Sequence, residues 1–344
     1  MTRTAVVVCP GRGTYNKSEL GYLHRHHAHS SLLPSFDAIR QAQQQETITA
    51  LDGAERFVGS TYTRGDIASP LIYTCTLADK EALADDIDVV AVTGNSMGWY
   101  STLAAAGAVS HDDGFQLVNT MGSLMQEHLI GGQLIYPFVD ENWRPEPGLK
   151  EALMAQVDRI NDSIDRELSL SIDLGGMLVL AGNEQGLRAF EQAVPIRQER
   201  FPMRLPNHAA FHTHLQAPVA RLGRARLSPD LFTQPQCPMI DGRGAIWWPG
   251  ATDPKALWQY TLDHQVIESY DFTAAIRTAA REFAPDLFIV TGPGNTLGGA
   301  VAQALILSHW RGIDSKARFV EQQTEQLVMC SMGLDAQRPA VSVA

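Results

Sequence analysis

The sequence predicts a soluble α/β protein built on a mainly parallel sheet. Three short apolar and β-branched runs, at 5–8, 88–93 and 287–291, are each followed within a few residues by glycine. Such runs are typical of strands buried on both faces of a parallel sheet. The alanine- and leucine-rich segments 98–108 and 296–308 follow the second and third runs and are expected to be helices. Because ligands bind at the carboxyl edge of such sheets, the glycine-containing loops there are the first candidates for a functional site.

Length and composition agree with this fold class. The 344 residues are 44% hydrophobic and 19% charged, which suffices to bury a core without disulfide or metal support. A net charge of -11, from 38 acidic and 27 basic residues, disfavours a nucleic-acid binder. Four scattered cysteines without CxxC spacing indicate a reduced chain with no cysteine metal site. There is no membrane-spanning apolar run and no signal-peptide pattern, so we expect a cytoplasmic protein that does not enter a membrane.

The middle of the chain has a different order of elements. Six elements are expected there, with strands at 132–139, 168–172, 177–181 and 201–205 and helices at 147–160 and 184–194. The order β-α-β-β-α-β is the ferredoxin-like, or split βαβ, pattern. We therefore expect a small ferredoxin-like domain at 131–205, inserted into a large α/β domain formed by 1–130 and 206–344.

The segment Gly94-Asn95-Ser96-Met97-Gly98 lies between the second strand and its helix. Its spacing is that of the G-x-S-x-G nucleophile elbow, in which small residues allow a tight turn that presents the serine at a helix N-terminus. This predicts an α/β-hydrolase-like large domain with Ser96 as the nucleophile and the amide of Met97 in an oxyanion hole. Alternatively, the serine only caps the helix.

A serine nucleophile needs a base, and the histidines offer several. Within 205–214, spacing leaves His208, His212 and His214 as equal candidates. A second histidine cluster, at 24–29, has no carboxylate nearby at ligand spacing, so we expect a solvated segment there and no metal site.

Five motifs follow one another along the chain: Cys9-Pro10-Gly11-Arg12-Gly13, Gly94-Asn95-Ser96-Met97-Gly98, Leu124-Met125-Gln126-Glu127, Ala210-Phe211-His212 and Gly292-Pro293-Gly294-Asn295-Thr296-Leu297-Gly298-Gly299. Together they resemble, nearly end to end, the malonyl-CoA:acyl-carrier-protein transacylases and the acyltransferase domains of polyketide and fatty acid synthases. That family also has a ferredoxin-like insertion at the same place. Five motifs in the same order are far more specific than any one of them.

The resemblance implies an acyltransferase with a serine–histidine dyad. Ser96 becomes the nucleophile and His212 its general base, while a backbone carbonyl from the segment around His264 orients the imidazole. The amides of Met97 and Arg12 would form the oxyanion hole. An acyl group would pass from a thioester of coenzyme A or of an acyl carrier protein to the phosphopantetheine thiol of a carrier protein, without a bound cofactor. The implied substrate-binding residues are Asn95, Met121, Ser69, Phe211, His264 and Asn295.

Several positions depart from the family's pattern. Arg12 replaces a glutamine, Asn95 replaces the histidine before the nucleophile, and Ser69 replaces a glutamine before a proline. The arginine that holds a malonyl carboxylate falls on Met121, and a thioether cannot replace a bidentate contact. We therefore expect an uncharged acyl group, with Phe211 narrowing the space at its α-carbon.

Three other interpretations stay open. A thioester hydrolase would use the same dyad with water as the acceptor. A genuine malonyl transferase would use Arg12 as a relocated carboxylate anchor. A non-catalytic acyl-binding subunit would explain the substituted polar positions, but not the retention of both Ser96 and His212.

A local basic stretch contrasts with the acidic net charge. Between 197 and 226 only Glu199 opposes six arginines, which are Arg197, Arg200, Arg204, Arg221, Arg224 and Arg226. The stretch is either a solvated face or a docking surface for the phosphates of coenzyme A or for an acidic carrier protein.

Overall fold

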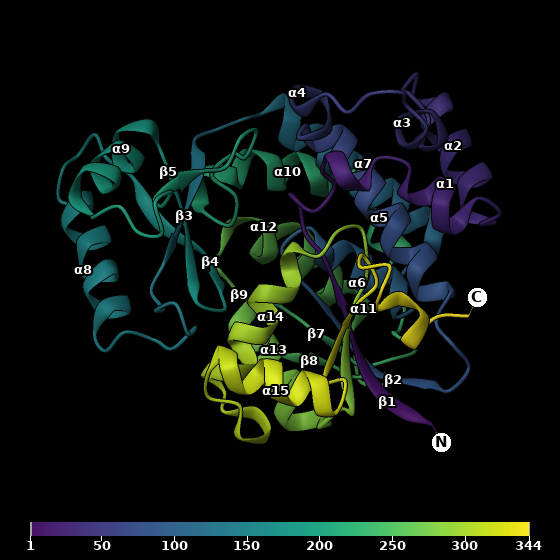
Figure 1. Ribbon diagram of the computed structural model, residues 1–344. Helices are drawn as coiled ribbons and strands as arrows, with labels where there is room; N and C mark the ends of the chain where they lie inside the picture. The colour runs from purple at the N-terminus through teal and green to yellow at the C-terminus, as the bar shows by residue number, and fades with distance from the viewer. Residues whose placement is uncertain (1, 344) are drawn as a thin grey trace.

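The larger of two sheets forms the centre of the molecule (Figure 1). The computed structural model describes residues 2–343. The six strands run in the order β11-β10-β1-β2-β7-β8, and every pairing is parallel except that of β7 with β8. Their bounds are β1 (Arg3–Cys9), β2 (Ile87–Gly94), β7 (Met239–Ile240), β8 (Ile246–Trp247), β10 (Leu287–Val290) and β11 (Met329–Ser331).

The three β-branched runs form the middle of this sheet, as predicted. β1 lies between β10 and β2, and the side chains of β10 are all buried. Helices pack against this sheet and against one another. They are α1 (Tyr22–His27), α2 (Leu32–Ala42), α3 (Ile48–Asp52), α4 (Gly59–Tyr62), α5 (Gly65–Glu81), α6 (Gly98–Ala105), α7 (His111–Glu127), α10 (Ala217–Arg226), α11 (Pro254–Gln259), α12 (Gln265–Ile267), α13 (Phe272–Phe283), α14 (Thr296–Leu307) and α15 (Lys316–Glu325), with a π-helical turn, η4, at Tyr260–His264. The other two helices, α8 (Leu149–Asn161) and α9 (Glu184–Ala193), belong to the second sheet.

A second sheet, with α8 and α9, projects to one side of the molecule, away from both termini (Figure 1). Its strands are β3 (Gly132–Pro137), β4 (Leu168–Leu174), β5 (Met177–Gly182), β6 (Met203–Arg204) and β9 (Tyr270–Asp271), in the order β6-β3-β5-β4-β9. The element order confirms the predicted ferredoxin-like pattern, and this unit has its own apolar cluster of buried side chains. The boundary residues of the inserted domain stay a proposal.

The fifth strand of the second sheet was not predicted. β9 follows the large-domain helices in sequence but pairs in parallel with β4, at Ile172 with Tyr270 and Asp173 with Asp271. Two residues are too few to produce a period of two, so no pattern marks this strand. Through β9 the two sheets are joined beside the turn that holds Ser96, because Tyr270 Oη donates to the carbonyl of Gly94 at 2.6 Å.

Within residues 2–343, no helix combines the length and the apolar composition needed to cross a bilayer.

Candidate active site

The turn between β2 and α6 is closed by contacts that only glycine permits. A Cβ on Gly94 would lie 2.4 Å from the carbonyl oxygen of Gly98, and one on Gly98 would lie 2.2 Å from that of Cys9. The amide of Asn95 donates to the same Cys9 carbonyl at 3.0 Å, which ties the turn to β1. Ser96 lies at the apex with φ 55°. This is the strained geometry of a nucleophile elbow.

Ser96 and His212 form a hydrogen-bonded dyad. Ser96 Oγ lies 2.7 Å from His212 Nε2, and His212 Nδ1 lies 2.7 Å from the backbone oxygen of Gln265. A carbonyl oxygen only accepts, so Nδ1 carries the proton and Nε2 accepts the serine O–H. The side chain of Gln265 also donates to the backbone oxygen of Ser96 at 3.0 Å. Gln265 therefore holds both members of the dyad.

Burial keeps the imidazole neutral. Only 4% of His212 is exposed. Desolvation lowers the pKa of His212 from 6.5 to about 4, against the smaller opposing effect of the Gln265 carbonyl. At neutral pH the side chain is in the form that a general base requires.

The structure distinguishes between the three histidines that spacing left as equal candidates for the base. His212 reaches Ser96, whereas His214 is exposed and lies 3.8 Å from a carboxylate oxygen of Glu167. His208 lines a cavity in front of Ser96 and bonds through Nδ1 to Gln133 at 2.9 Å.

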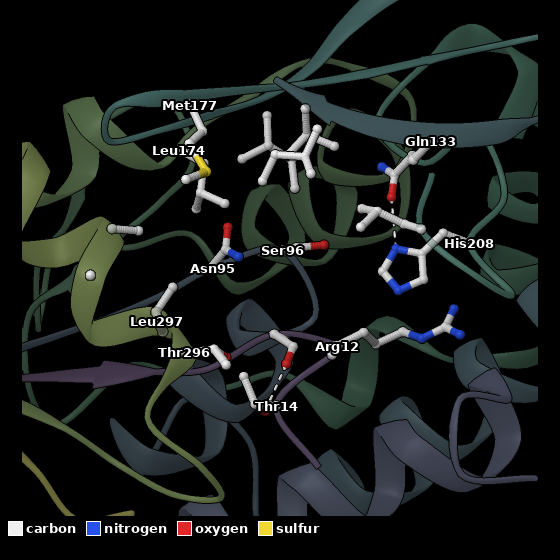
Figure 2. A pocket seen from close by; sticks show the side chains of 18 of the residues that line it. Arg12, Thr14, Asn95, Ser96, Gln133, Leu174, Met177, His208, Thr296 and Leu297 are labelled. Carbon is white, nitrogen blue, oxygen red and sulfur yellow. Dashed lines mark hydrogen bonds between the residues drawn. The ribbon is translucent and has the colours of Figure 1, made fainter. Parts of the chain in front are cut away.

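Two cavities meet at Ser96. The large cavity, of about 640 Å³, lies between the second sheet and α14 and has a mainly apolar wall (Figure 2). It is lined among others by Ile135, Ile172, Val179, Leu297 and Ala300. The small cavity, of about 20 Å³, is lined among others by Ser69, Met97, Tyr100, Met125 and Val266. Ser96, Arg12 and Phe211 line both, so they stand at the junction.

Arg12 is a partly buried cation with unused donors. Its Nη2 donates to the backbone oxygens of Thr63 and Asn207, at 2.6 and 2.9 Å, and its guanidinium lies 5.3 Å from the ring centre of Phe211. Within residues 2–343, Nε and Nη1 have no hydrogen-bond partner. Burial lowers the pKa of Arg12 to about 10, so the side chain stays charged at neutral pH. An enclosed charged donor without a partner carries a free-energy cost that a bound anion would remove.

The backbone amides assigned to the oxyanion hole are available. The N–H groups of Met97 and Arg12 make no hydrogen bond to the described part of the chain. Met97 lines the small cavity and Arg12 lines both. Such paired free amides beside a serine suit a developing negative charge.

Asn95 and Ser69 also lie where the sequence places them. Asn95 lines the large cavity, is 8% exposed, and its Oδ1 has no partner within residues 2–343. Ser69, on α5, lines the small cavity and is buried.

Met121 does not reach either cavity. Its side chain is fully buried, and its Sδ lies 2.7 Å from where a Cβ on Gly223 of α10 would be. Successive residues of an α-helix are rotated by about 100°, so α7 presents Gly122 and Met125 to the small cavity and turns Met121 toward α10. The expectation that Met121 contacts the acyl group therefore lacks support in the structure.

His264 and Asn295 also lie off the cavity walls. The ring of His264 stacks on Tyr260, with 5.4 Å between ring centres, and it is the next residue, Gln265, whose carbonyl holds the imidazole. Asn295 is exposed at the start of α14, where its neighbour Thr296 lines the large cavity.

The N-terminal histidine cluster is not simply solvated, which corrects the expectation. His27 is buried and its Nε2 lies 2.7 Å from Asp79, and His26 lies 3.3 Å from Asp335. Both carboxylates are remote in sequence, so spacing could not reveal them. Within residues 2–343, no group of three His, Cys, Asp or Glu side chains is arranged to hold a metal ion.

Half of the arginines in the basic stretch are paired. Arg197 bonds to Glu146, Arg204 to Glu184 and Glu191, and Arg224 to Asp263. Carboxylates from other elements therefore neutralise much of the local charge. Within the described chain, three arginines of the stretch have no ion-pair partner. They are Arg200, which lines the large cavity, and the exposed Arg221 and Arg226.

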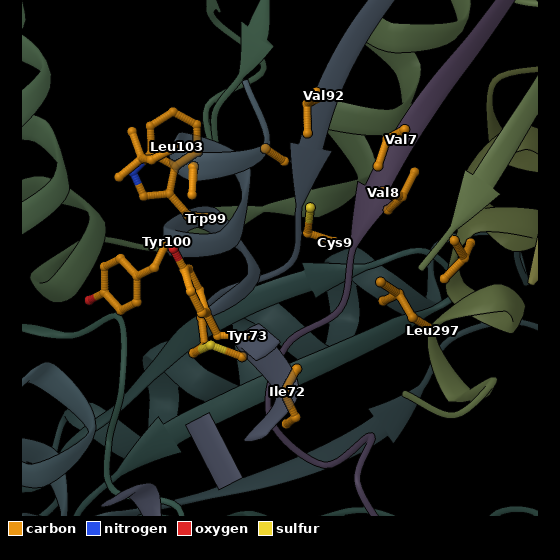
Figure 3. Packing of buried hydrophobic residues seen from close by; sticks show 14 of the residues in the cluster. Val7, Val8, Cys9, Ile72, Tyr73, Val92, Trp99, Tyr100, Leu103 and Leu297 are labelled. Atoms are coloured by element: carbon orange, nitrogen blue, oxygen red, sulfur yellow. The ribbon is translucent and has the colours of Figure 1, made fainter. Parts of the chain in front are cut away.

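The turn that holds Ser96 rests on a large apolar core. Figure 3 shows Trp99, Tyr100 and Leu103 of α6 near Tyr73 of α5. Trp99 is fully buried, and its Nε1 donates to Thr261 at 2.9 Å. This packing fixes the helix α6, which begins two residues after Ser96.

Comparison with known proteins points to one family, although no family model matches the sequence. The malonyl CoA-acyl carrier protein transacylase of Bacillus subtilis is 24% identical over 236 residues, which are 68% of this chain and 71% of the relative. The polyketide biosynthesis protein ThaF of Burkholderia thailandensis is 28% identical over 149 residues, 43% of this chain and 12% of ThaF. At these low identities, the chain is similar in sequence to malonyl-CoA:acyl-carrier-protein transacylases and to part of a polyketide biosynthesis protein.

Solved structures of transacylases share the fold over the whole chain. The malonyl-CoA:acyl carrier protein transacylase (FabD) of Xanthomonas oryzae pv. oryzae superposes with a TM-score of 0.74 at 18% identity and covers 100% of both chains. A malonyl-transacylase in complex with a type II PKS acyl-carrier protein, PlMCAT:AntF, gives a TM-score of 0.72 at 18% identity, covering 98% of this chain and 97% of the other. At such identities the likeness supports the fold, and the chemistry is argued from the site.

Sequence reasoning missed Gln133 and Tyr270 altogether, and it missed the contacts that Gln265 and His208 make. Gln265 lies next to His264 in the segment expected to supply a carbonyl, so the resemblance pointed within one residue of it. His208 was a candidate base. No spacing or motif marks Gln133, whose partners lie elsewhere in the chain.

Proposed function

We propose that the chain is a transacylase that moves an acyl group from a thioester of coenzyme A or an acyl carrier protein, through acyl-Ser96, to the phosphopantetheine thiol of a carrier protein. The observation that carries this proposal is the dyad at the cavity junction. Ser96 lies 2.7 Å from a neutral His212, next to two free amides. This constellation suits acyl transfer through a covalent ester.

In the first half-reaction, His212 Nε2 takes the proton of Ser96 Oγ as that oxygen bonds to the thioester carbon. The amides of Met97 and Arg12 hold the oxyanion of the tetrahedral intermediate. The C–S bond then breaks, and the departing sulfur takes the proton from His212. In the second half-reaction the carrier thiol gives its proton to His212 and bonds to the acyl carbon, and Ser96 is released with its proton restored.

The rival thioester hydrolase would use water in place of the carrier thiol. The low exposure of His212 and the mainly apolar wall of the large cavity support transfer, because both limit water at the ester. A non-catalytic acyl-binding subunit would not need the bonded dyad. The paired arginines leave Arg200, Arg221 and Arg226 as the part of the basic stretch that could contact phosphates or an acidic carrier protein.

The volume and the lining of the small cavity indicate the size and the charge of the acyl group. A volume of about 20 Å³ corresponds to little more than one water, which supports a short acyl group. The sequence predicted an uncharged group, and the apolar side chains of Met125 and Val266 agree with that. The free Nε and Nη1 of Arg12 favour the alternative, in which the acyl group ends in a carboxylate as malonyl does.

The proposal is tested by incubating the protein with acetyl-, malonyl- and octanoyl-CoA and measuring its intact mass. We expect an adduct that Ser96→Ala abolishes and that the exposed control Ser18→Ala retains. Added holo carrier protein should take up the acyl group. Release of free acid with no acylated carrier would establish the hydrolase instead. If neither an adduct nor turnover is seen, the protein would be interpreted as a non-catalytic acyl-binding subunit.

The role of Arg12 is tested in the same assay with Arg12→Gln, which keeps the backbone amide and removes the cation. Loss of a charge-assisted contact of about 1.5–3 kcal/mol should lower the malonyl-to-acetyl rate ratio at least about tenfold. Wild-type protein that prefers acetyl-CoA, with a ratio unchanged in Arg12→Gln, would establish the uncharged acyl group.

A further inference from the structure

A β-bulge directs one buried serine of the second sheet toward the active site. The register of β4 against β5 shifts between Leu170 and Ile172, which leaves Ser171 without a partner on β5. Bulges of this kind re-aim a side chain and are frequent beside active sites. Ser171 is fully buried, and its Oγ lies 2.8 Å from the backbone oxygen of Phe211, next to His212.

From Ser171 a chain of hydrogen bonds leads to the large cavity. The Phe211 carbonyl only accepts, so Ser171 donates to it and must accept from Gln133 Nε2, at 2.7 Å. This orients the buried Gln133 amide with its oxygen toward His208. Gln133 Oε1 lies 2.9 Å from His208 Nδ1, which must therefore carry a proton. The direction of each bond in the Ser171–Gln133–His208 chain is thus determined by the Phe211 carbonyl.

The Ser171–Gln133–His208 hydrogen bonds leave the Nε2 atom of His208 free to accept a further hydrogen bond. Burial, and the nearby charge of Arg12, lower the pKa of His208 well below its ordinary value, so the ring is neutral and its Nε2 carries a lone pair. Among residues 2–343, no donor bonds to Nε2. Figure 2 shows the ring on the wall of the large cavity, on the side to which the Ser96 side chain points. A polar acceptor in a mainly apolar cavity calls for a donor on the ligand.

We propose that His208 Nε2 accepts a hydrogen bond from the secondary amide of the phosphopantetheine arm in the large cavity. This rests on the proposed function. A thioester and a simple acyl group have no N–H or O–H to offer, whereas the cysteamine amide lies two carbons from the sulfur that Ser96 displaces. Coenzyme A and the carrier protein share this arm, so His208 would orient the substrate in both half-reactions.

The test uses two small thioesters that differ in one N–H group. They are the S-acyl derivative of N-acetylcysteamine and that of 2-mercaptoethyl acetate, in which an ester oxygen replaces the amide N–H. Both compounds carry the same acyl group, which is acetyl or malonyl according to which of the two labels Ser96 faster. For each enzyme variant, kcat/KM of Ser96 acylation is measured for the two compounds, and their ratio is compared. The ratio cancels differences in active-site concentration.

In His208→Phe the amide-to-ester ratio should fall about 3- to 10-fold below that of wild type, which corresponds to the loss of one neutral hydrogen bond. The exposed control His214→Phe should keep the wild-type ratio. His208→Gln supplies another side-chain acceptor and should restore part of it.

An unchanged ratio in His208→Phe overturns the inference. If both rates fall equally, the Ser171–Gln133–His208 chain serves only to position the loop of His212. If wild-type protein forms no acyl-Ser96 with any donor, the proposed function itself fails, and the two failures are thereby distinguished.

Discussion

The two dyad residues have backbone conformations that side chains rarely adopt. Ser96 has φ 55° and His212 has φ 57°. Left-handed conformations of non-glycine residues cost about 1–3 kcal/mol each and persist where the surroundings enforce them. Here Gln265 bonds to both residues, and the amide of His212 donates to the carbonyl of Val266 at 3.1 Å. The strain is therefore held at the short Ser96–His212 contact, where the proposed proton transfer would occur.

The burial of His212 predicts the pH dependence of acylation. Its pKa is lowered to about 4, so the neutral base predominates above that pH and is lost below it. The rate of Ser96 acylation should be level through neutral pH and fall on acidification with a midpoint near 4. A stopped-flow measurement of thiol release gives this profile, with circular dichroism at each pH to confirm folding. A midpoint near 6.5 in folded protein would contradict the buried geometry.

At the scale of elements, the β2–α6 turn depends on close backbone approach. A Cβ on Gly98 would lie 2.2 Å from the carbonyl oxygen of Cys9, a backbone atom that cannot move aside as the end of a flexible side chain could. This steric overlap could be removed only by moving α6 away from β1. Gly98→Ala should therefore lower the free energy of unfolding by about 2 kcal/mol or more. Calorimetry or urea unfolding measures the change.

The matched control for that prediction is Gly59→Ala at the start of α4, where an added Cβ meets nothing within 4 Å. This substitution should be neutral or slightly stabilising, because alanine favours a helix over glycine. Equal losses in the two variants would show that steric contact with Cys9 is not the cause.

At the scale of the whole molecule, Asp79 joins segments that are remote in sequence. This fully buried carboxylate lies 2.7 Å from His27 Nε2 and from Arg338 Nη2, and 2.7 Å from Tyr22 Oη. It also accepts from the amide of Gly292 at 2.6 Å, in the loop that precedes α14. The Asp79 network therefore holds α1, α5, the C-terminal segment and one wall of the large cavity together.

Removing this carboxylate should be costly. Asp79→Ala leaves the buried Arg338 without its counter-charge and is expected to lower the free energy of unfolding by about 3–5 kcal/mol. The control Asp335→Ala removes the exposed partner of His26 and should cost less than about 1 kcal/mol. Similar losses in both variants, measured by urea unfolding, would refute the special role of the Asp79 network.

The same network links stability to acid. Burial alone would raise the pKa of Asp79, but the bond from His27 and the charge of Arg338 outweigh it and hold the pKa below the usual value. A carboxylate with a depressed pKa stabilises the fold above its unfolded pKa, and this contribution is lost as the pH falls.

Local features of this chain were predictable because their causes lie within a few consecutive residues. Buried strands such as 287–291, the ferredoxin-like element order and the glycines around Ser96 each follow from chain-local patterns or steric needs. The motif order added the assignment of His212, which spacing by itself left undecided between three histidines.

Long-range packing decided the rest. Met121 faces α10 because of its angular position on α7. The Arg12 guanidinium is placed by bonds to Thr63 and Asn207, which lie more than 50 residues away in the sequence. Gln265, the carboxylates that pair with the basic stretch, and the Ser171–Gln133–His208 chain likewise join distant parts of the chain. Sequence alone determined the sheet and the turn that presents Ser96, since these depend on local sterics and periodicity. Only the tertiary structure decided which polar groups meet at the cavities, because that depends on how separate elements pack.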